Sequence, residues 1–310
     1  MQSAGWVMVR YDQGCSMIST ELAEWFNARW FGEMGAIDGQ DVAFIADLIA
    51  QHRPRNVVEI GCASGMSSCI LAALMSSAGG GTLNSFDLME HYYVNPEKPV
   101  GYLLAEAPPH PGVSVTVNRG KTCLDVAGQI DGQIDLCFID AAHKHPWPLI
   151  DTLGVLPLMK PGGIIIHHDL QMFRTAQGNA YANGPKMVLA LAPPATRIYP
   201  DDASQARGRE VMKSRKISHN IFALRVPETR RAFAAQLCEG FYFGWDKQSY
   251  QLVPSDFAMR FSTFLEEHYG PYVGQAWAEG VRRYSTPVES PPLPRVGSLP
   301  RRILRRISGR

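Results

Sequence analysis

The sequence predicts an α/β fold: a Rossmann-like, seven-stranded, mostly parallel sheet with helices on both faces, plus helical extensions at the two ends of the chain. Two observations predict it. Apolar segments such as residues 56–60 are rich in Val and Ile, which is typical of parallel strands buried on both faces. Strand-like and helix-like segments then alternate up to Asp169, which indicates a parallel sheet covered by helices.

The length and composition favour one large domain with extensions. The chain has 310 residues, of which 45% are hydrophobic, and an average of about 150 residues per domain permits two domains. We expect an N-terminal helical cover over residues 1–37, the main domain over 38–227 and a helical extension over 228–285. Residues 286–310 are rich in Pro and Arg with few apolar anchors, so we expect a disordered, solvated tail.

Charge, cysteine content and the length of apolar runs indicate which partners and which compartment to expect. A formal net charge of +1 gives no reason to expect nucleic acid or an anionic membrane as partner. The six cysteines lack metal-ligand spacing, which indicates buried free thiols in a reducing compartment. No apolar run reaches the roughly 18 residues of a transmembrane helix, and the amino terminus has no signal-peptide pattern. We therefore expect a cytoplasmic protein.

The elements follow in a regular order. Asp38 is a predicted helix N-cap, and the apolar periodicity behind it ends before Pro54. The next strands are predicted at residues 56–60, 82–88, 113–118 and 134–139, and a fifth lies within 158–169. Residues 196–199 and 220–226 are expected to be the last two strands. The polar and basic segment 201–218 between them is expected to be a mobile loop that can act as a lid.

The segment from 228 to 284 returns to helical periodicity and is rich in aromatic residues. Aromatic side chains at such spacing more often pack in a core or at a subunit interface than bind a ligand. We therefore expect core packing or a homodimer interface there, with substrate binding as the weaker alternative.

The turn after the first strand carries the strongest functional signal. Glycines at 61 and 65 permit a tight turn and a close backbone approach to a ligand. A dinucleotide-binding turn needs the pattern G-x-G-x-x-G, but Ala63 and Met66 occupy two of its glycine positions. A nicotinamide-dependent dehydrogenase is therefore disfavoured, although it is kept as an alternative.

Several motifs resemble those of a known enzyme family. The acid-x-Gly-x-x-x-Gly turn begins at Glu59, Asp87 ends the second predicted strand, and a Lys-Pro-Gly-Gly turn occupies residues 160–163. In this order, over about residues 40–226, they resemble class I S-adenosylmethionine-dependent methyltransferases. The D-x-x-H ending at Asp140 and the His-Asp ending at Asp169 resemble the branch of catechol O-methyltransferase and of bacterial sugar and natural-product O-methyltransferases.

The resemblance implies a set of cofactor contacts. Glu59 would accept hydrogen bonds from the methionine ammonium group or an ordered water, and Asp87 would bind both ribose hydroxyls. The turn around Thr122 would contact adenine, with a cap of the following helix as the alternative role of Thr122. The full set of implied cofactor-binding residues is Glu59, Gly61, Ala63, Ser64, Gly65, Asp87, Gly120, Thr122 and Asp140.

Asp140 and Asp169 end neighbouring predicted strands, so their carboxylates are expected to meet near the methyl group of the cofactor. Two buried acids repel each other unless a positive charge neutralises them, and Mg²⁺ or another divalent cation does so in metal-dependent relatives. Those relatives usually continue with Asn or Asp, whereas Leu170 stands here. Metal dependence is thus left open, with Asp140 orienting the cofactor or His143 as the alternative.

His143 lies three residues after Asp140, where some relatives place a catalytic lysine. An imidazole with a pKa near neutrality can take the proton of an acceptor hydroxyl during methyl transfer. We therefore expect His143 and Asp140 to be catalytic, against the alternative that His143 is structural. Further basic side chains follow the same two strands and are weaker candidates: Lys144, His145, His167 and His168.

The predicted function is methyl transfer from S-adenosylmethionine to a small-molecule or saccharide acceptor, most simply to a hydroxyl oxygen. A binding or assembly protein that has kept the fold and lost turnover is the alternative from another class, and the four retained acids argue against it. Sugars, phenols, natural products and lipid-linked saccharides all remain possible acceptors, because the regions expected to select the acceptor lie outside the matched motifs.

Overall fold

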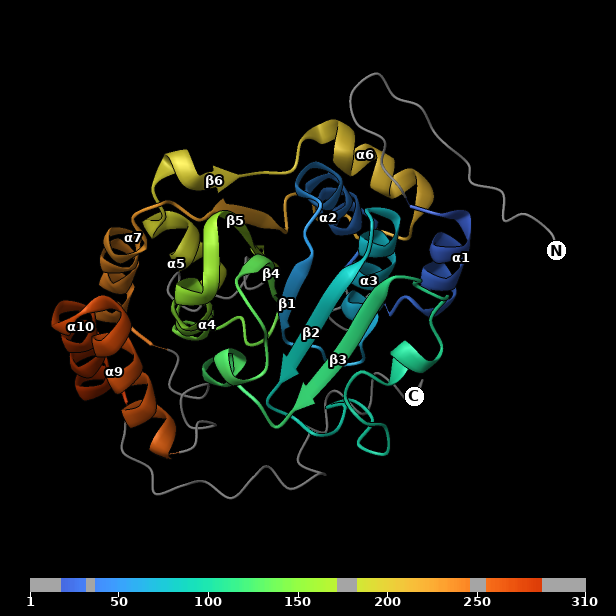
Figure 1. Ribbon diagram of the computed structural model, residues 1–310. Helices are drawn as coiled ribbons and strands as arrows, with labels where there is room; N and C mark the ends of the chain where they lie inside the picture. Colours follow the sequence, from blue (N-terminus) through green and yellow to red (C-terminus); the bar gives the residue numbers. More distant parts are fainter. Residues whose placement is uncertain (1–17, 32–36, 172–182, 246–254, 286–310) are drawn as a thin grey trace, which may run out of the picture.

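The computed structural model describes residues 18–31, 37–171, 183–245 and 255–285. Its centre is a seven-stranded sheet with the strand order β3-β2-β1-β4-β5-β7-β6 (Figure 1). Strands β1 to β5 run parallel, and β7 is antiparallel to both β5 and β6, so the predicted fold class is confirmed. The strands are β1 Asn56–Ile60, β2 Gly81–Asp87, β3 Val113–Arg119, β4 Ile134–Ile139, β5 Met159–His167, β6 Arg197–Ile198 and β7 Phe222–Arg225.

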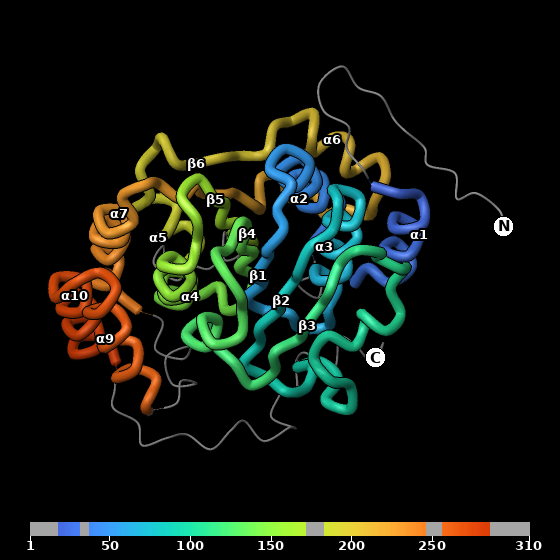
Figure 2. The backbone as a smooth tube through the Cα atoms, in the orientation of Figure 1, coloured from blue at the N-terminus to red at the C-terminus, as the bar shows by residue number. Residues whose placement is uncertain are grey.

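Helices cover both faces of the sheet, as the tube view also shows (Figure 2). The α-helices are α1 Thr20–Arg29, α2 Gly39–His52, α3 Met66–Ser77, α4 Trp147–Val155, α5 Gly184–Leu191, α6 Asp202–Val211, α7 Arg230–Leu237, α9 Ser255–Tyr269 and α10 Pro271–Tyr284. Short 3-10 helices join them: η1 Tyr102–Ala105, η2 Cys123–Gly128, η3 Leu156–Leu158, η5 Pro194–Thr196 and η6 Cys238–Tyr242.

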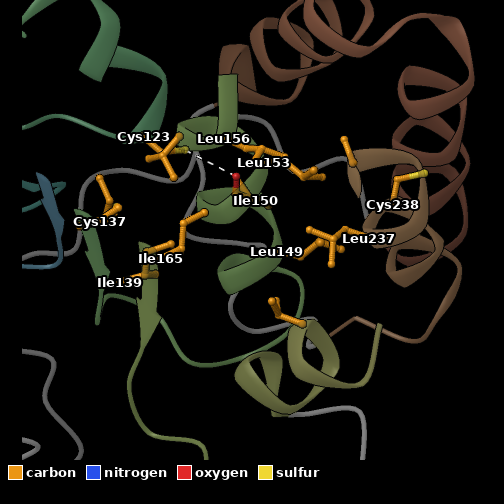
Figure 3. Close-up of a cluster of buried hydrophobic side chains, with 14 of the residues drawn as sticks. Cys123, Cys137, Ile139, Leu149, Ile150, Leu153, Leu156, Ile165, Leu237 and Cys238 are labelled. Carbon is orange, nitrogen blue, oxygen red and sulfur yellow. Dashed lines mark hydrogen bonds between the residues drawn. The ribbon is translucent and has the colours of Figure 1, made fainter. Parts of the chain in front are cut away.

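Each face of the sheet has its own hydrophobic core, because successive strand residues point to opposite faces. On β1, Val57 packs with α1, α2 and α3, whereas Val58 packs with α4, α5 and the C-terminal helices. Part of the second core is drawn in Figure 3, where Leu149 and Leu153 of α4 lie near Leu237 of α7. The unbroken Val/Ile character of the strands is thus explained by burial on both sides.

The expected loop over residues 201–218 is corrected by the structure, since α6 occupies its first half. The side chain of Asp201 caps this helix by accepting a hydrogen bond from the Ser204 amide. Helix α6 packs closely on α2: a Cβ added at Gly208 would lie 2.0 Å from the Gly39 carbonyl oxygen. The contact with α2 stabilises a helix whose polar sequence has no apolar stripe of its own.

The C-terminal extension packs on the main domain through aromatic side chains. Trp277 is 1% exposed, and the rings of Phe241 and Phe261 meet it edge-to-face. The expectation of core packing is met by these contacts, whereas a homodimer interface stays a prediction. At the other end, α1 supplies the helical cover, with Trp25 and Phe26 buried; residues 1–17 and the 286–310 tail lie outside the described residues.

Two further expectations concern thiols and membranes. The five cysteines in the described part of the chain are buried and unpaired, and Cys15 lies outside it. No helix within the described ranges combines the length and apolarity of a membrane span. The predicted domain boundaries at residues 38, 228 and 286 stay predictions.

The close contact of α6 with α2 gives a stability test. We expect Gly208→Ala to lower the free energy of unfolding by about 2 kcal/mol, because the added methyl group must displace the Gly39 carbonyl. Gly128→Ala is the matched control, since nothing lies within 4 Å of an added Cβ there. Urea unfolding should show no loss for the control; equal stability of the two variants would contradict the packing.

Candidate active site

The parallel register brings three strand ends together at the carboxyl edge of the sheet. Ile139 of β4 pairs with His167 of β5, so Asp140 and His168 are the first residues beyond this pair. The Asp140 amide donates to the Ile60 carbonyl at 2.8 Å, and the His168 amide donates to the Ile139 carbonyl at 3.2 Å. The sheet therefore fixes the backbone of both residues beside the glycine turn that follows β1.

That turn is held by backbone contacts that only glycine permits. Gly61 has a φ of 97°, and an added Cβ would lie 2.5 Å from the Asp140 carbonyl oxygen. At Gly65, with a φ of 90°, the added Cβ would lie 2.9 Å from Gly101 Cα. The neighbouring strand end alone therefore requires glycine at position 61, and the close approach of a ligand there stays a prediction.

Glu59 lies beneath the turn and is 0% exposed. Its carboxylate accepts hydrogen bonds from the hydroxyls of Ser67 and Ser68 on α3 and of Ser85 on β2. Burial raises the Glu59 pKa to about 7, although the three hydroxyl donors oppose the shift. Glu59 therefore joins α3 to β1 and β2, and its direct contact with a cofactor ammonium group stays a prediction.

Asp87 is oriented by the backbone of the turn. Its Oδ2 accepts hydrogen bonds from the amides of Cys62 at 3.0 Å and Ala63 at 2.9 Å, and its Oδ1 accepts one from Met89 at 2.8 Å. Burial raises the Asp87 pKa, while these three amides oppose the shift. A half-buried carboxylate fixed in this way is suited to accept hydrogen bonds from a pair of ribose hydroxyls.

The remaining turn residues are partly committed to the fold. Ala63 is in the left-handed region at φ 47°, and Ser64 is buried, its carbonyl accepting a hydrogen bond from the Leu103 amide. Thr122 forms a capping box with Asp125 at the start of η2, which is the structural role foreseen for it. Gly120 lies at φ 65° in the turn before it, and adenine contact there stays a prediction.

A fully buried histidine lies between two acids at the strand ends. His168 Nδ1 is 3.0 Å from Asp140 Oδ1, and His168 Nε2 is 3.0 Å from Asp41 Oδ2 of α2. Both ring nitrogens thus face acceptors, which requires both to carry protons. Burial alone would lower the His168 pKa, but the charges of Asp140, Asp169 and Asp41 hold it well above its ordinary value.

Asp169 is positioned by strained backbone and by a side-chain amide. It adopts a left-handed φ of 58°, uncommon for a residue with a side chain, and its Oδ1 accepts a hydrogen bond from Asn220 Nδ2 at 2.8 Å. Burial would raise the Asp169 pKa, but the charge of His168, the nearby His143, the Asn220 hydrogen bond and Arg215 hold it below its ordinary value. Asp169 therefore stays ionised inside the protein.

His143 completes the cluster from the connection between β4 and α4. Its Nε2 lies 3.3 Å from Asp169 Oδ2, a buried oxygen that makes no hydrogen bond to any described residue. The histidine side chain is 21% exposed, whereas that of Asp169 is 2% exposed. The structure thus places a partly exposed imidazole against a buried, ionised acid, and a histidine general base needs an acid placed in this way.

The same atoms fit a divalent cation. Asp140, His143 and Asp169 each offer a ligand atom within 4.8 Å of the others, so His143 joins the two acids that the sequence suggested. His168 contacts Asp41, Asp140 and Asp169, so three carboxyl groups gather around this place. A set with one imidazole suits Mn²⁺, Fe²⁺ or Zn²⁺ better than Mg²⁺, and whether a metal is needed stays open. Leu170 is buried and supplies no ligand.

The other predicted basic candidates are placed apart from this cluster. His145 and His167 are buried, and burial lowers their pKa values to about 4 and about 3, so both are neutral. His167 stacks on Phe222 and lies 3.1 Å from Thr152 Oγ1. Lys144 pairs as an isolated bridge with Asn183 in the backbone. These histidines therefore serve the fold rather than proton transfer.

Sequence reasoning missed three contributors to the site. The sequence predicts Asp41 only as part of a helix and Asn220 only as a strand residue, and it ranks His168 among the weaker catalytic candidates. A signal exists for one of them, because a helix that leads into the first strand of a parallel sheet begins near the carboxyl ends of the strands, so an acid in its first turn can face the site. The partners themselves are far apart in sequence: 127 residues separate Asp41 from His168.

Comparisons with known proteins match one segment of this chain to a family model and find solved structures of low sequence identity. Residues 58–170 match a family model described as a methyltransferase domain, and the search of curated proteins found no match. The O-methyltransferase from Bacillus cereus, solved in complex with SAH, is 17% identical, with 71% of this chain and 93% of that chain covered and a TM-score of 0.45. The O-methyltransferase TomG from Streptomyces achromogenes, solved in complex with SAM, is also 17% identical. The match covers 71% of this chain and 92% of that chain, with a TM-score of 0.44.

The strand order, with its antiparallel β7, and the matching family model define a methyltransferase domain. The protein is an S-adenosylmethionine-dependent methyltransferase, as the sequence motifs indicated, and its predicted enzyme class is confirmed. The match stops at residue 170, so β6, β7 and the C-terminal helices lie beyond it.

The geometry of Asp87 gives a binding test. We expect Asp87→Ala to weaken S-adenosylmethionine binding at least about tenfold, equivalent to roughly 1.4 kcal/mol, because two ribose hydroxyls lose their acceptor. Calorimetric titration measures the affinity. Asp131→Ala, a change in the exposed turn before β4, is the control and should bind as the wild type does. An unchanged affinity in Asp87→Ala would remove the ribose assignment.

Proposed function

We propose that this protein transfers the methyl group of S-adenosylmethionine to a hydroxyl oxygen of a small-molecule or saccharide acceptor, with His143 as general base. The observation that carries the proposal is the contact of the partly exposed His143 imidazole with the buried Asp169 carboxylate. The contact lies at the strand ends, where ligands bind in open α/β sheets, and Asp140 stands next to it.

Each residue has a defined task in this proposal. The bound cofactor supplies an electrophilic methyl group on a sulfonium. Asp87 and the glycine turn hold the cofactor, and Asp140, fixed by His168, borders the place of transfer. His143 holds its Nε2 proton towards Asp169, so that Nδ1 is free to accept the acceptor's hydroxyl proton as the new C–O bond forms and the methyl C–S bond breaks, leaving S-adenosylhomocysteine. Asp169 then stabilises the resulting imidazolium.

The two readings of the cluster require different tautomers of His143. As a general base, the ring carries its proton on Nε2, which faces Asp169, and accepts on Nδ1. As a metal ligand through the same Nε2, the ring would offer the lone pair of that nitrogen and carry its proton on Nδ1. One ring cannot do both, so chelation separates the two mechanisms.

The alternatives from other classes are less well supported. A dehydrogenase would need the glycines that Ala63 and Met66 replace. A binding protein without turnover would have no need to keep an ionised acid on strained backbone beside a solvent-accessible imidazole. Incubation with tritiated S-adenosylmethionine and fractionated cell extract, followed by mass spectrometry of the labelled product, tests the reaction and identifies the acceptor. Label found only on nitrogen or carbon would contradict the hydroxyl assignment.

We expect His143→Ala to slow the chemical step by about 10²-fold or more, because general-base catalysis typically contributes 10²–10⁴. Cofactor affinity should change little, since no cofactor contact is assigned to the imidazole. Single-turnover transfer to the labelled acceptor fraction measures the step. His110→Ala, which removes a half-buried histidine before β3, serves as control. A near-normal rate in His143→Ala would show that His143 is structural.

The general-base mechanism also predicts the response to metal removal. Because His143 and the ionised Asp169 accept and stabilise the proton by themselves, exhaustive chelation should leave the transfer rate within about twofold of the untreated enzyme. The measurement is transfer by dialysed enzyme with and without EDTA, followed by addition of Mn²⁺ or Mg²⁺. Loss of activity that either cation restores would assign the Asp140, His143 and Asp169 cluster to a metal instead.

A further inference from the structure

The connection that carries His143 is anchored to the C-terminal part of the chain. His145, two residues further on, is 0% exposed, and its Nε2 lies 2.9 Å from the Gly240 carbonyl oxygen of η6. A carbonyl oxygen can only accept, so Nε2 carries the proton and donates it. This hydrogen bond joins positions 95 residues apart in the sequence and is buried from solvent.

The segment that accepts this bond is seated tightly between helices of the main domain. A Cβ added at Gly240 would lie 2.7 Å from Leu149 Cδ2 of α4 and 2.9 Å from Leu191 Cδ1 of α5. Behind it, the ring of Phe241 contacts Trp277 of α10 with centroids 5.2 Å apart. Figure 3 shows the same side of the core, with Leu149 facing Leu237 at the end of α7. The η6 backbone is therefore held in place from both sides.

The opposite side of the connection is held by α5. The Gly184 amide, at the start of that helix, donates to the His143 carbonyl at 2.8 Å. A Cβ added at Gly184 would lie 2.4 Å from Pro148 Cδ, so α5 and the start of α4 touch directly. Farther along, the Trp147 ring meets Phe257 of α9 with centroids 5.9 Å apart. Residues 143–146 thus run between two buried supports.

We propose that the C-terminal extension positions His143, and that His145 is the positioning residue through which it acts. The connection has no regular secondary structure of its own apart from a backbone bridge at Lys144, so ordering it costs conformational entropy. An imidazole that must stay at hydrogen-bonding distance from a fixed acid needs such support, because a displacement of about 1 Å can cost 10²-fold in rate. Its catalytic consequence rests on the function proposed above for His143.

The C-terminal extension lies outside the region that matches the methyltransferase family model. The extension begins beyond residue 227, whereas the matched region ends at residue 170. Its helices do not reach the strand ends by any contact described above; they reach α4, α5 and the backbone of the His143 connection. The extension therefore acts on the site indirectly, by holding the connection that carries His143.

Hydrogen–deuterium exchange of the peptide spanning residues 141–147 tests the anchor without any substrate. His145→Phe keeps a ring and removes the donor, and we expect exchange there to become at least about tenfold faster. His145→Gln places an amide donor near the position of Nε2 and should stay within about twofold of wild type. Tyr269→Phe removes another bond between extension and α4, from the tyrosine hydroxyl to the Leu153 carbonyl, and should leave this peptide unchanged.

Single-turnover transfer to the labelled acceptor fraction tests the catalytic consequence. His145→Phe should lose about tenfold in the chemical step with unchanged calorimetric affinity for S-adenosylhomocysteine, and His145→Gln should recover most of the rate. Unchanged exchange in His145→Phe would overturn the proposal, and so would faster exchange with a normal rate. If the wild type transfers no label, the function proposed above fails, while the exchange experiment still decides whether the anchor exists.

Discussion

The site depends on one buried interaction, the charged His168 ring held between Asp41 and Asp140. Each ring nitrogen lies 3.0 Å from a carboxylate oxygen, and the side chain is completely buried. Breaking such a pair by removing one partner leaves an uncompensated buried charge, which typically costs 3–5 kcal/mol. The interaction joins α2, β4 and β5 at the edge of the sheet, so the acids of the site keep their places only while this contact persists.

The amino-terminal turn of α2 also helps to position Asp169. Asp41 accepts hydrogen bonds from His168 and from the Asp38 amide, and Gln40 donates to the carbonyls of Arg215 and Ile217. The chain held in this way continues directly to Asn220, whose amide fixes Asp169. Helix α2 therefore orients one acid through His168 and the other through the segment before β7. The first helical turn, whose residues lie before the matched region, is in this sense part of the site.

Local patterns made most of the fold predictable. The Val/Ile runs and the glycine turn follow from burial and backbone geometry within a few residues, and the strand-end rule placed Asp140 beside Asp169. The failures share a physical cause, which is dependence on distant partners. Helix α6 exists because Gly208 packs on Gly39, and its polar sequence gives no sign of that contact. Likewise, no local pattern links Asp41 to His168, because the two residues are 127 positions apart in the sequence.

The central claim is that cofactor and proton acceptor meet at acids fixed by His168. The most direct test is a crystal structure with bound S-adenosylhomocysteine. The account predicts ribose hydroxyls on Asp87, the sulfur facing His143 and Asp169, and His168 still in contact with both Asp41 and Asp140. A cofactor bound away from Asp87, or a His168 ring that has left either carboxylate, would contradict it.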